Sequence, residues 1–244
     1  MTRNDLYLPA EDFAGEPPVA TASSDTPVVL DRRTGPYGEV ALRRHGERLE
    51  IIANGTFLMD TSDGRSERLL VDAALEALPA DRPGPEVLIG GLGVGFSLAR
   101  AVAEPRWGRI TVVERESAVV EWHHEGRFAP YSGHALADPR VRLVTEDLVP
   151  YLGDTQDMYD ALCLDVDNGP DWTVTENNGS LYSPSGLIVC RERLHPGGIL
   201  AVWSAQPSAA FEAVLRGAGF GEVRTLEVQV ARGVPDVVHV AVKA

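Results

Sequence analysis

The order of apolar and polar positions separates a first half of short elements from a longer α/β pattern. Residues 1–30 mix prolines with acidic and hydroxyl side chains without an apolar period, so we expect a flexible segment there. Residues 40–60 contain short apolar runs around Asn54-Gly55, a strong β-hairpin signal. Residues 66–78 place apolar side chains at helical spacing before a Pro-containing linker. Residues 31–80 are therefore predicted to form a small antiparallel β domain with one helix.

Beyond residue 80, strand-like apolar runs alternate with helical segments. The runs are residues 87–89, 110–113, 141–144, 161–164 and 199–203. Such alternation builds right-handed βαβ units and a parallel sheet with helices on both faces. Two further β-rich runs near the end of the chain have no helix between them, so they should pair antiparallel at the sheet edge. Residues 81–244 are thus predicted to form a doubly wound α/β domain.

The first strand of that domain runs into a glycine-rich stretch. Residues 87–95 read Val-Leu-Ile-Gly-Gly-Leu-Gly-Val-Gly, and a helical segment starts at Phe96. Glycines at a strand-to-helix turn let the backbone approach a ligand, toward which the helix N-terminus points. The spacing departs from the G-x-G-x-x-G of dinucleotide-binding folds, and such glycines can also serve helix packing alone. We assign cofactor contacts to Gly90, Gly91, Gly93 and Gly95.

Acidic residues follow each of the next three strands. Ligands of open α/β sheets bind beyond the carboxyl ends of the strands, and Glu114 follows the glycines by about twenty residues, as a ribose-binding acid would. Asp147 follows the third strand, where it can alternatively cap the helix that starts at Leu148. Asp165 and Asp167 follow the fourth strand and are the candidate catalytic residues, with Asp165 favoured as a general base.

A segment rich in turn-forming residues, 167–184, comes next. Long segments of this kind in compact domains are commonly lids or binding loops. Its aromatic residues can stack on a cationic substrate or pack the loop onto the core. We assign substrate contacts to Asn168, Trp172, Glu176 and Tyr182. His123 and His124, after the second strand, are interpreted as surface residues.

Charge and composition limit the partners. The chain has 36 acidic and 22 basic residues and a formal charge of −14, which repels phosphate backbones and anionic membranes but tolerates a cationic substrate. We therefore expect neither a nucleic-acid nor a membrane partner. No secretory signal or membrane span is recognised, so a cytoplasmic location is expected. The two cysteines, Cys163 and Cys190, are interpreted as ordinary buried thiols, and no metal site is expected.

As an ordered set, these motifs resemble the spermidine synthase family, which shares the class I S-adenosylmethionine-dependent methyltransferase fold. The resemblance is carried by residues 87–95, 110–114, 138–147, 159–165 and 194–200. It implies a seven-stranded, mostly parallel Rossmann-like sheet behind a small N-terminal β domain. It also implies a ribose contact by Glu114, an adenine contact by Asp147, a further cofactor contact by Leu148 and a catalytic role for Asp165. A homodimer is compatible with the resemblance.

The chain departs from that family where a polyamine would bind. Polyamine synthases carry an aspartate within the glycine loop, where this chain has Gly93-Val94. They also have a glutamine at the position of Leu58 and a Tyr-His pair at the position of Glu67-Arg68. These departures make an S-adenosylmethionine-dependent methyltransferase acting on a small-molecule nucleophile the first hypothesis.

Two alternatives stay open. One is an aminopropyltransferase, a spermidine synthase that uses decarboxylated S-adenosylmethionine and putrescine. In that enzyme Asp165 would take a proton from the attacking amine, while Asp167 and Glu176 would hold the cationic substrate. The other is a non-catalytic regulator that binds a nucleoside.

Overall fold

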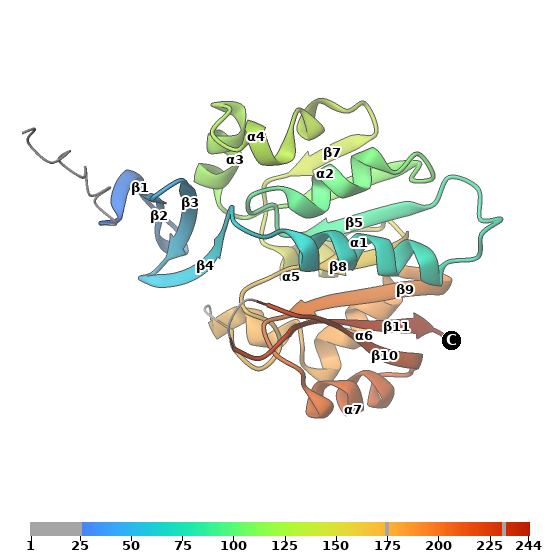
Figure 1. The fold of residues 1–244 in the computed structure, drawn as a ribbon. Helices are drawn as coiled ribbons and strands as arrows, with labels where there is room; N and C mark the ends of the chain where they lie inside the picture. Colours follow the sequence, from blue (N-terminus) through green and yellow to red (C-terminus); the bar gives the residue numbers. More distant parts are fainter. Residues whose placement is uncertain (1–25, 174–175, 231–232) are drawn as a thin grey trace, which may run out of the picture.

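The computed structural model describes residues 26–173, 176–230 and 233–244 (Figure 1). Residues 1–25 of the segment expected to be flexible lie outside this part of the chain. Residues 28–30 of that segment already belong to a strand, β1 (Val28–Gly35), which the apolar pattern does not predict. β1 begins a four-stranded antiparallel sheet that continues with β2 (Gly38–His45), β3 (Arg48–Ala53) and β4 (Thr56–Asp60).

The predicted Asn-Gly hairpin joins β3 to β4. Asn54 and Gly55 both adopt positive φ angles, 50° and 79°, as a two-residue turn of this kind requires. The Asn54 side chain ties the turn to the neighbouring hairpin, because Oδ1 accepts from the Glu39 amide at 2.9 Å and Nδ2 donates to the Tyr37 carbonyl at 3.1 Å. The small sheet therefore has a defined end beside the β1–β2 turn.

The second sheet has seven strands in the order β10-β11-β9-β8-β5-β6-β7, which confirms the predicted fold class. Its strands are β5 (Glu86–Gly90), β6 (Arg109–Val113), β7 (Val141–Val144), β8 (Tyr159–Leu164), β9 (Leu194–Ser204), β10 (Phe220–Val228) and β11 (Asp236–Lys243). The five strands from β5 to β9 are parallel, while β11 pairs antiparallel with both β9 and β10. The terminal hairpin thus lies at the sheet edge, as the sequence indicates.

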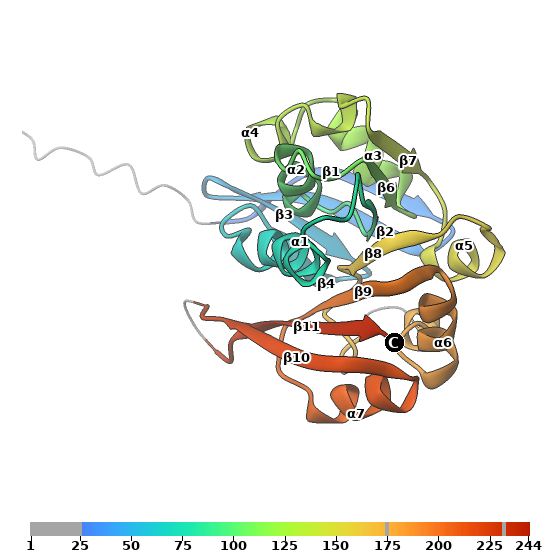
Figure 2. The ribbon, with the colours of Figure 1, turned by 90° about the vertical axis from the view of Figure 1, so that its right-hand side faces the viewer.

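Helices cover both faces of the large sheet (Figure 2). The first face carries α1 (Arg65–Ala77), α2 (Phe96–Ala103) and α3 (Ser117–His124), and the second carries α5 (Leu148–Asp154), α6 (Pro184–Glu192) and α7 (Ala209–Gly217). Shorter elements are α4 (Ala129–Ser132), η1 (Ala135–Ala137) and η2 (Glu176–Ser180). Although α1 follows the small sheet in sequence, it packs against α2, β8, β9 and β11.

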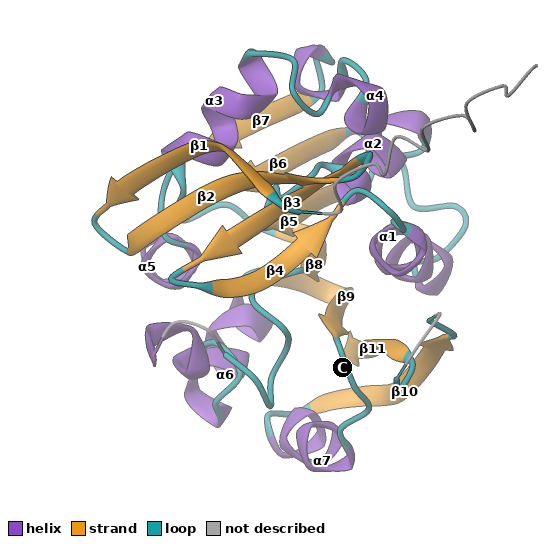
Figure 3. Ribbon diagram, turned by 60° about the vertical axis from the view of Figure 1, so that its left-hand side comes forward, coloured by secondary structure: helices purple, strands orange, loops and turns teal. Residues whose placement is uncertain are grey.

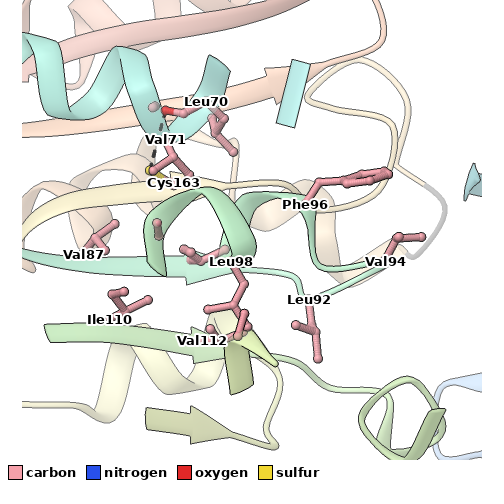
Figure 4. Packing of buried hydrophobic residues seen from close by; sticks show 14 of the residues in the cluster. Leu70, Val71, Val87, Leu92, Val94, Phe96, Leu98, Ile110, Val112 and Cys163 are labelled. Atoms are coloured by element: carbon pink, nitrogen blue, oxygen red, sulfur yellow. Dashed lines mark hydrogen bonds between the residues drawn. The ribbon is translucent and has the colours of Figure 1, made fainter. Parts of the chain in front are cut away.

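Alternating residues of the buried strands explain the two layers. Val87 and Ile89 of β5 face the α1–α3 cluster, whereas Leu88 between them faces the α5–α7 cluster. Figure 4 shows the first cluster, in which the Cys163 thiol lies 3.8 Å from the Leu70 carbonyl of α1. Both cysteines are buried free thiols, as predicted. Two apolar faces therefore hold the sheet rigidly between helical layers.

Figure 3 shows how the two sheets meet. The small sheet lies across the carboxyl ends of the parallel strands, which is also seen at the left of Figure 1. In an open α/β fold this is the edge at which ligands bind. The antiparallel sheet consequently forms a wall opposite the strand ends. None of the helices among the described residues is long and apolar enough to cross a bilayer.

Candidate active site

A cavity of about 670 Å³ lies between the small sheet and the carboxyl ends of β5, β6 and β8. Most of the residues singled out from sequence line it. They are Gly91, Gly93, Glu114, Asp147, Leu148, Asp165, Asp167, Asn168 and Trp172. The fold therefore gathers residues from four separate segments around one space large enough for a nucleoside with an attached chain.

Two of the predicted glycines, Gly90 and Gly95, lie against packed side chains and outside the cavity lining. A Cβ on Gly90 would come within 2.6 Å of the Leu148 side chain, and one on Gly95 would come within 2.8 Å of His123 and Ser132. Neither glycine lines the cavity. Close helix packing, the alternative role of such glycines, accounts for both positions.

Asn168 and Trp172 are the predicted substrate residues that line the cavity, and the other two are Tyr182 and Glu176. Tyr182 is 5% exposed, its hydroxyl donates to the Val166 carbonyl at 2.9 Å, and its ring meets Phe211 edge-on. It packs the loop onto the core and does not line the cavity. The backbone of Glu176 begins η2, and its side chain lies outside the described residues.

Glu114 is hydrogen-bonded to the glycine loop. Its Oε2 accepts from the Leu92 amide at 2.9 Å and its Oε1 from the Glu116 amide at 2.8 Å. Each carboxylate oxygen can accept a further hydrogen bond. The nearly buried carboxylate thus fixes the loop and still offers acceptors to the cavity.

Asp147 caps a helix and lies at the cavity wall. It is the N-cap of α5, where Oδ1 accepts from the Val149 amide at 2.9 Å. The same side chain lines the cavity next to Leu148. Capping holds the carboxylate in one orientation at the cavity wall.

Asp165 lies at the centre of the site, directly after β8. Its amide donates to the Gly90 carbonyl at 2.9 Å, which continues the pairing of β8 with β5 beyond the last strand residue. Burial, and then the neighbouring carboxylates of Glu67, Asp236 and Glu114, raise the pKa of Asp165 well above its usual range. The carboxyl group is therefore a stronger base than an ordinary aspartate.

Asp167 is the second candidate catalytic residue. Its backbone is left-handed, with φ of 57°, and its Oδ2 accepts from the Asn178 side chain at 2.9 Å. Asn178 is buried and also lines the cavity, although nothing in the local pattern singles it out. The strained backbone and the amide contact direct Asp167 toward the same space as Asp165.

Glu67 and Asp236 are functional candidates that sequence reasoning does not identify. Glu67, 7% exposed, lies in the first turn of α1, and Asp236 begins β11. The Ser66 hydroxyl lies 3.0 Å from a carboxylate oxygen of each. Burial, followed by repulsion from Asp236 and Asp63, raises the pKa of Glu67 to about 7. Its position on the apolar face of the predicted helix was the available signal for Glu67, whereas Asp236 has no local signal.

The cavity is strongly acidic. Ten carboxylate residues line it, namely Asp60, Asp63, Glu67, Glu114, Glu116, Glu146, Asp147, Asp165, Asp167 and Asp236. The basic residue among its described lining is Arg115, which lies 3.3 Å from Glu116 and over the Tyr37 ring. The described side chains contain no cluster arranged to hold a metal ion. The electrostatics of the site thus favour an organic cation.

His123 corrects one interpretation. The sequence indicates a surface residue, but the side chain is half-buried and its Nε2 lies 2.8 Å from the Gly93 carbonyl oxygen. Burial lowers its pKa below the usual value of 6.5. His123 follows the buried Val119 by one helical turn, so the helical register contained a signal for this placement.

Comparisons with known proteins agree with this geometry. No protein-family model matches the chain. Polyamine aminopropyltransferase 2 of Ralstonia nicotianae is 25% identical over 200 residues, covering 79% of this chain and 38% of the relative. Polyamine aminopropyltransferase 2 of Pseudomonas aeruginosa is 30% identical over 168 residues, covering 64% and 45%. The chain spans less than half the length of these curated relatives.

A solved structure extends the likeness to the fold. The crystal structure of spermidine synthase in complex with the transition-state analogue AdoDATO aligns with a TM-score of 0.74 at 16% identity, covering 88% of this chain and 74% of that one. At this identity the likeness shows a shared fold. In sequence the chain is similar to polyamine aminopropyltransferases, and it shares the fold of the spermidine synthase structure, a mostly parallel seven-stranded α/β sheet with a small antiparallel sheet before it.

Proposed function

We propose that the protein is an aminopropyltransferase that transfers the aminopropyl group of decarboxylated S-adenosylmethionine to an amine of a polyamine such as putrescine. The observation that carries the proposal is the acidic lining around Asp165, which suits a cationic donor and a cationic acceptor together. The names of the sequence relatives favour the same reaction over methyl transfer, the first hypothesis from sequence.

The nucleoside end of the donor fits the part of the cavity formed by β6 and α5. Glu114 supplies carboxylate acceptors for ribose hydroxyls, and Asp147 supplies an acceptor for an adenine amino group. The backbone of Gly91 and Gly93 lines the cavity together with these side chains, so the donor is proposed to contact the glycine loop there. These residues bind and orient the donor, whose sulfonium makes the adjacent carbon electrophilic.

Asp165 is the proposed general base. A polyamine amine is protonated near neutral pH, and its nitrogen needs a free electron pair to attack carbon. The raised pKa of the Asp165 carboxylate brings its basicity closer to that required for taking this proton. The Asp165 carboxylate first takes a proton from the ammonium group, which frees the nitrogen electron pair. The nitrogen then forms the new carbon–nitrogen bond as the carbon–sulfur bond breaks, and methylthioadenosine leaves with the electrons of that bond.

Glu67 and Asp236 are proposed to balance the charge of the acceptor. In the free protein, burial and then repulsion from Asp63 raise the pKa of both groups, so they retain protons more readily than exposed carboxylates. A cation beside them favours their ionised forms. Binding of a polyamine should therefore release protons, which calorimetry in buffers of different ionisation enthalpy would detect.

The proposed reaction is tested by its products. The purified protein is incubated with either S-adenosylmethionine or its decarboxylated form, each with a panel of polyamines. Formation of methylthioadenosine together with a lengthened polyamine supports aminopropyl transfer. Formation of S-adenosylhomocysteine would instead establish methyl transfer. Absence of any nucleoside binding by calorimetry would contradict both enzymatic functions.

A further inference from the structure

One peptide group of the glycine loop is held from both sides. The carbonyl oxygen of Gly93 lies 2.8 Å from Nε2 of His123 in α3, and the amide of the same peptide, on Val94, lies 3.3 Å from Sδ of Met59 in β4. Because a carbonyl oxygen only accepts, the His123 Nε2 carries the hydrogen and donates it. Through these two contacts the Gly93–Val94 peptide links α3, which packs on the large sheet, to β4 of the small sheet.

The backbone on the amino side of this peptide, at Gly93, restrains it little. Gly91, Gly93 and Gly95 have φ angles of 95°, 49° and 93°, in a region that glycine enters without steric cost. Rotation of the Gly93–Val94 peptide would exchange the directions of its carbonyl and amide. The contacts with His123 and Met59 oppose that rotation, since each one fits a single orientation of the group.

Met59 also fills the space next to Gly93. A Cβ added to Gly93 would overlap the Met59 sulfur, so the thioether lies where a side chain at that position would begin. Both residues line the cavity. The small sheet therefore supplies part of the surface that a bound donor would meet at the glycine loop.

His123 is itself held in place for this contact. Its Nδ1 lies 3.4 Å from the Ser132 hydroxyl, and its ring is 4.9 Å from the Phe128 ring, centroid to centroid. These neighbours fix the ring plane with Nε2 directed at the loop. The imidazole is thus oriented by packing and does not itself line the cavity.

We propose that His123 and Met59 are positioning residues that hold the Gly93–Val94 peptide in the orientation required for donor binding. The identity of the donor rests on the proposed function, whereas the restraint on the peptide exists in the free protein. Loss of either contact should weaken donor binding and leave the acceptor and the chemical step nearly unchanged.

The test compares His123→Gln with His123→Leu. The glutamine amide can place a donor near the position of Nε2, whereas leucine cannot donate. We expect His123→Leu to raise the KM for the donor about tenfold, the effect of one lost hydrogen bond, with kcat and acceptor KM within about threefold of wild type. His123→Gln should recover most of the donor KM. His124→Leu, at the exposed neighbouring position, is the matched control.

A second measurement reads the peptide directly. Amide exchange of Val94, followed by NMR in the ligand-free protein, should accelerate about tenfold or more in Met59→Leu, because leucine keeps the volume but removes the sulfur acceptor. Unchanged Val94 exchange would overturn the role of Met59, and equal donor KM in His123→Leu and wild type would overturn that of His123. If wild type bound no donor, the proposed function would fail, and Val94 exchange in His123→Leu and Met59→Leu would still decide the restraint.

Discussion

The backbone carbonyl of Asp165 lies against Gly91, in the position that a Cβ on that glycine would occupy. Gly91 has a φ of 95°, which an alanine would adopt only with strain. Gly91→Ala should therefore push the glycine loop away from β8 and lower the free energy of unfolding by about 2–4 kcal/mol. Urea unfolding measures the stability, and calorimetry measures the accompanying loss of donor affinity.

Gly153 offers a control for that substitution. It lies in α5, and a Cβ there would meet no atom within 4 Å. Gly153→Ala should leave stability unchanged or raise it by about 0.5–1 kcal/mol, as alanine does in helices. Equal effects of the two substitutions would contradict the close contact between Gly91 and Asp165.

Removing the proposed base should separate chemistry from binding. Asp165→Asn keeps the size of the side chain but cannot take a proton, so kcat should fall by about 10²–10⁴-fold. The donor's dissociation constant, measured by calorimetry, should change by less than about threefold, the level of one weak contact. Asp167→Asn serves as the comparison and should have the smaller effect on kcat. A larger loss in Asp167→Asn would reverse the assignment.

Glu67 should make stability depend on pH. Its pKa in the folded protein is about 7, raised from 4.5, so the folded state retains this proton where the unfolded chain has released it. Stability is therefore highest below pH 4.5 with respect to this group and falls as the pH rises toward 7. Over that range Glu67→Gln should gain up to about 3 kcal/mol relative to wild type.

Urea unfolding of both proteins at pH 5 and pH 8 would measure this difference. The gain in Glu67→Gln should appear at the higher pH and shrink at the lower one, because protonated glutamate and glutamine are both neutral. A saturating polyamine should reduce the difference in unfolding free energy between Glu67→Gln and wild type at pH 8, because it favours the ionised Glu67 carboxylate. A gap of the same size at both pH values would contradict the raised pKa.

The two aromatic residues of the loop after β8 should behave differently. Tyr182→Phe removes the hydrogen bond to the Val166 carbonyl and should cost about 1 kcal/mol of stability with little change in acceptor KM. Trp172 is 57% exposed and forms part of the cavity wall. Trp172→Ala should therefore raise the acceptor KM with little change in stability. Denaturation measures the stability of both variants, and steady-state kinetics measures their acceptor KM. A raised acceptor KM in Tyr182→Phe would show that Tyr182 contacts the substrate.

Local periodicity was sufficient for the elements that place the donor side of the cavity. The apolar strand before Gly90, the helix after Gly95 and the acid after β6 are all encoded within a few neighbouring residues. β1 was missed because Val28, Val29 and Leu30 are consecutive exposed apolar residues, so the strand has no alternation of apolar and polar positions.

Long-range contacts explain what the sequence did not predict in the site. Ser66 and Asp236 are 170 positions apart, and only the pairing of β11 with β9 brings Asp236 beside α1. Likewise, Trp172 and Tyr182 occupy one loop without a regular period, so their opposite placements depend on where the loop meets the core. Neither relationship leaves a pattern that can be recognised along the chain.

The position of β11 also sets an order of events during synthesis. β11 lies between β9 and β10, yet it follows both of them in the chain and leaves the ribosome after them. The parallel strands and the cavity wall that carries Glu114 can form earlier, whereas the Ser66–Asp236 contact waits for the hairpin of β10 and β11. A nascent chain would thus form the wall at the strand ends before the carboxylate pair of Glu67 and Asp236, and the cavity would be complete only once β11 has left the ribosome.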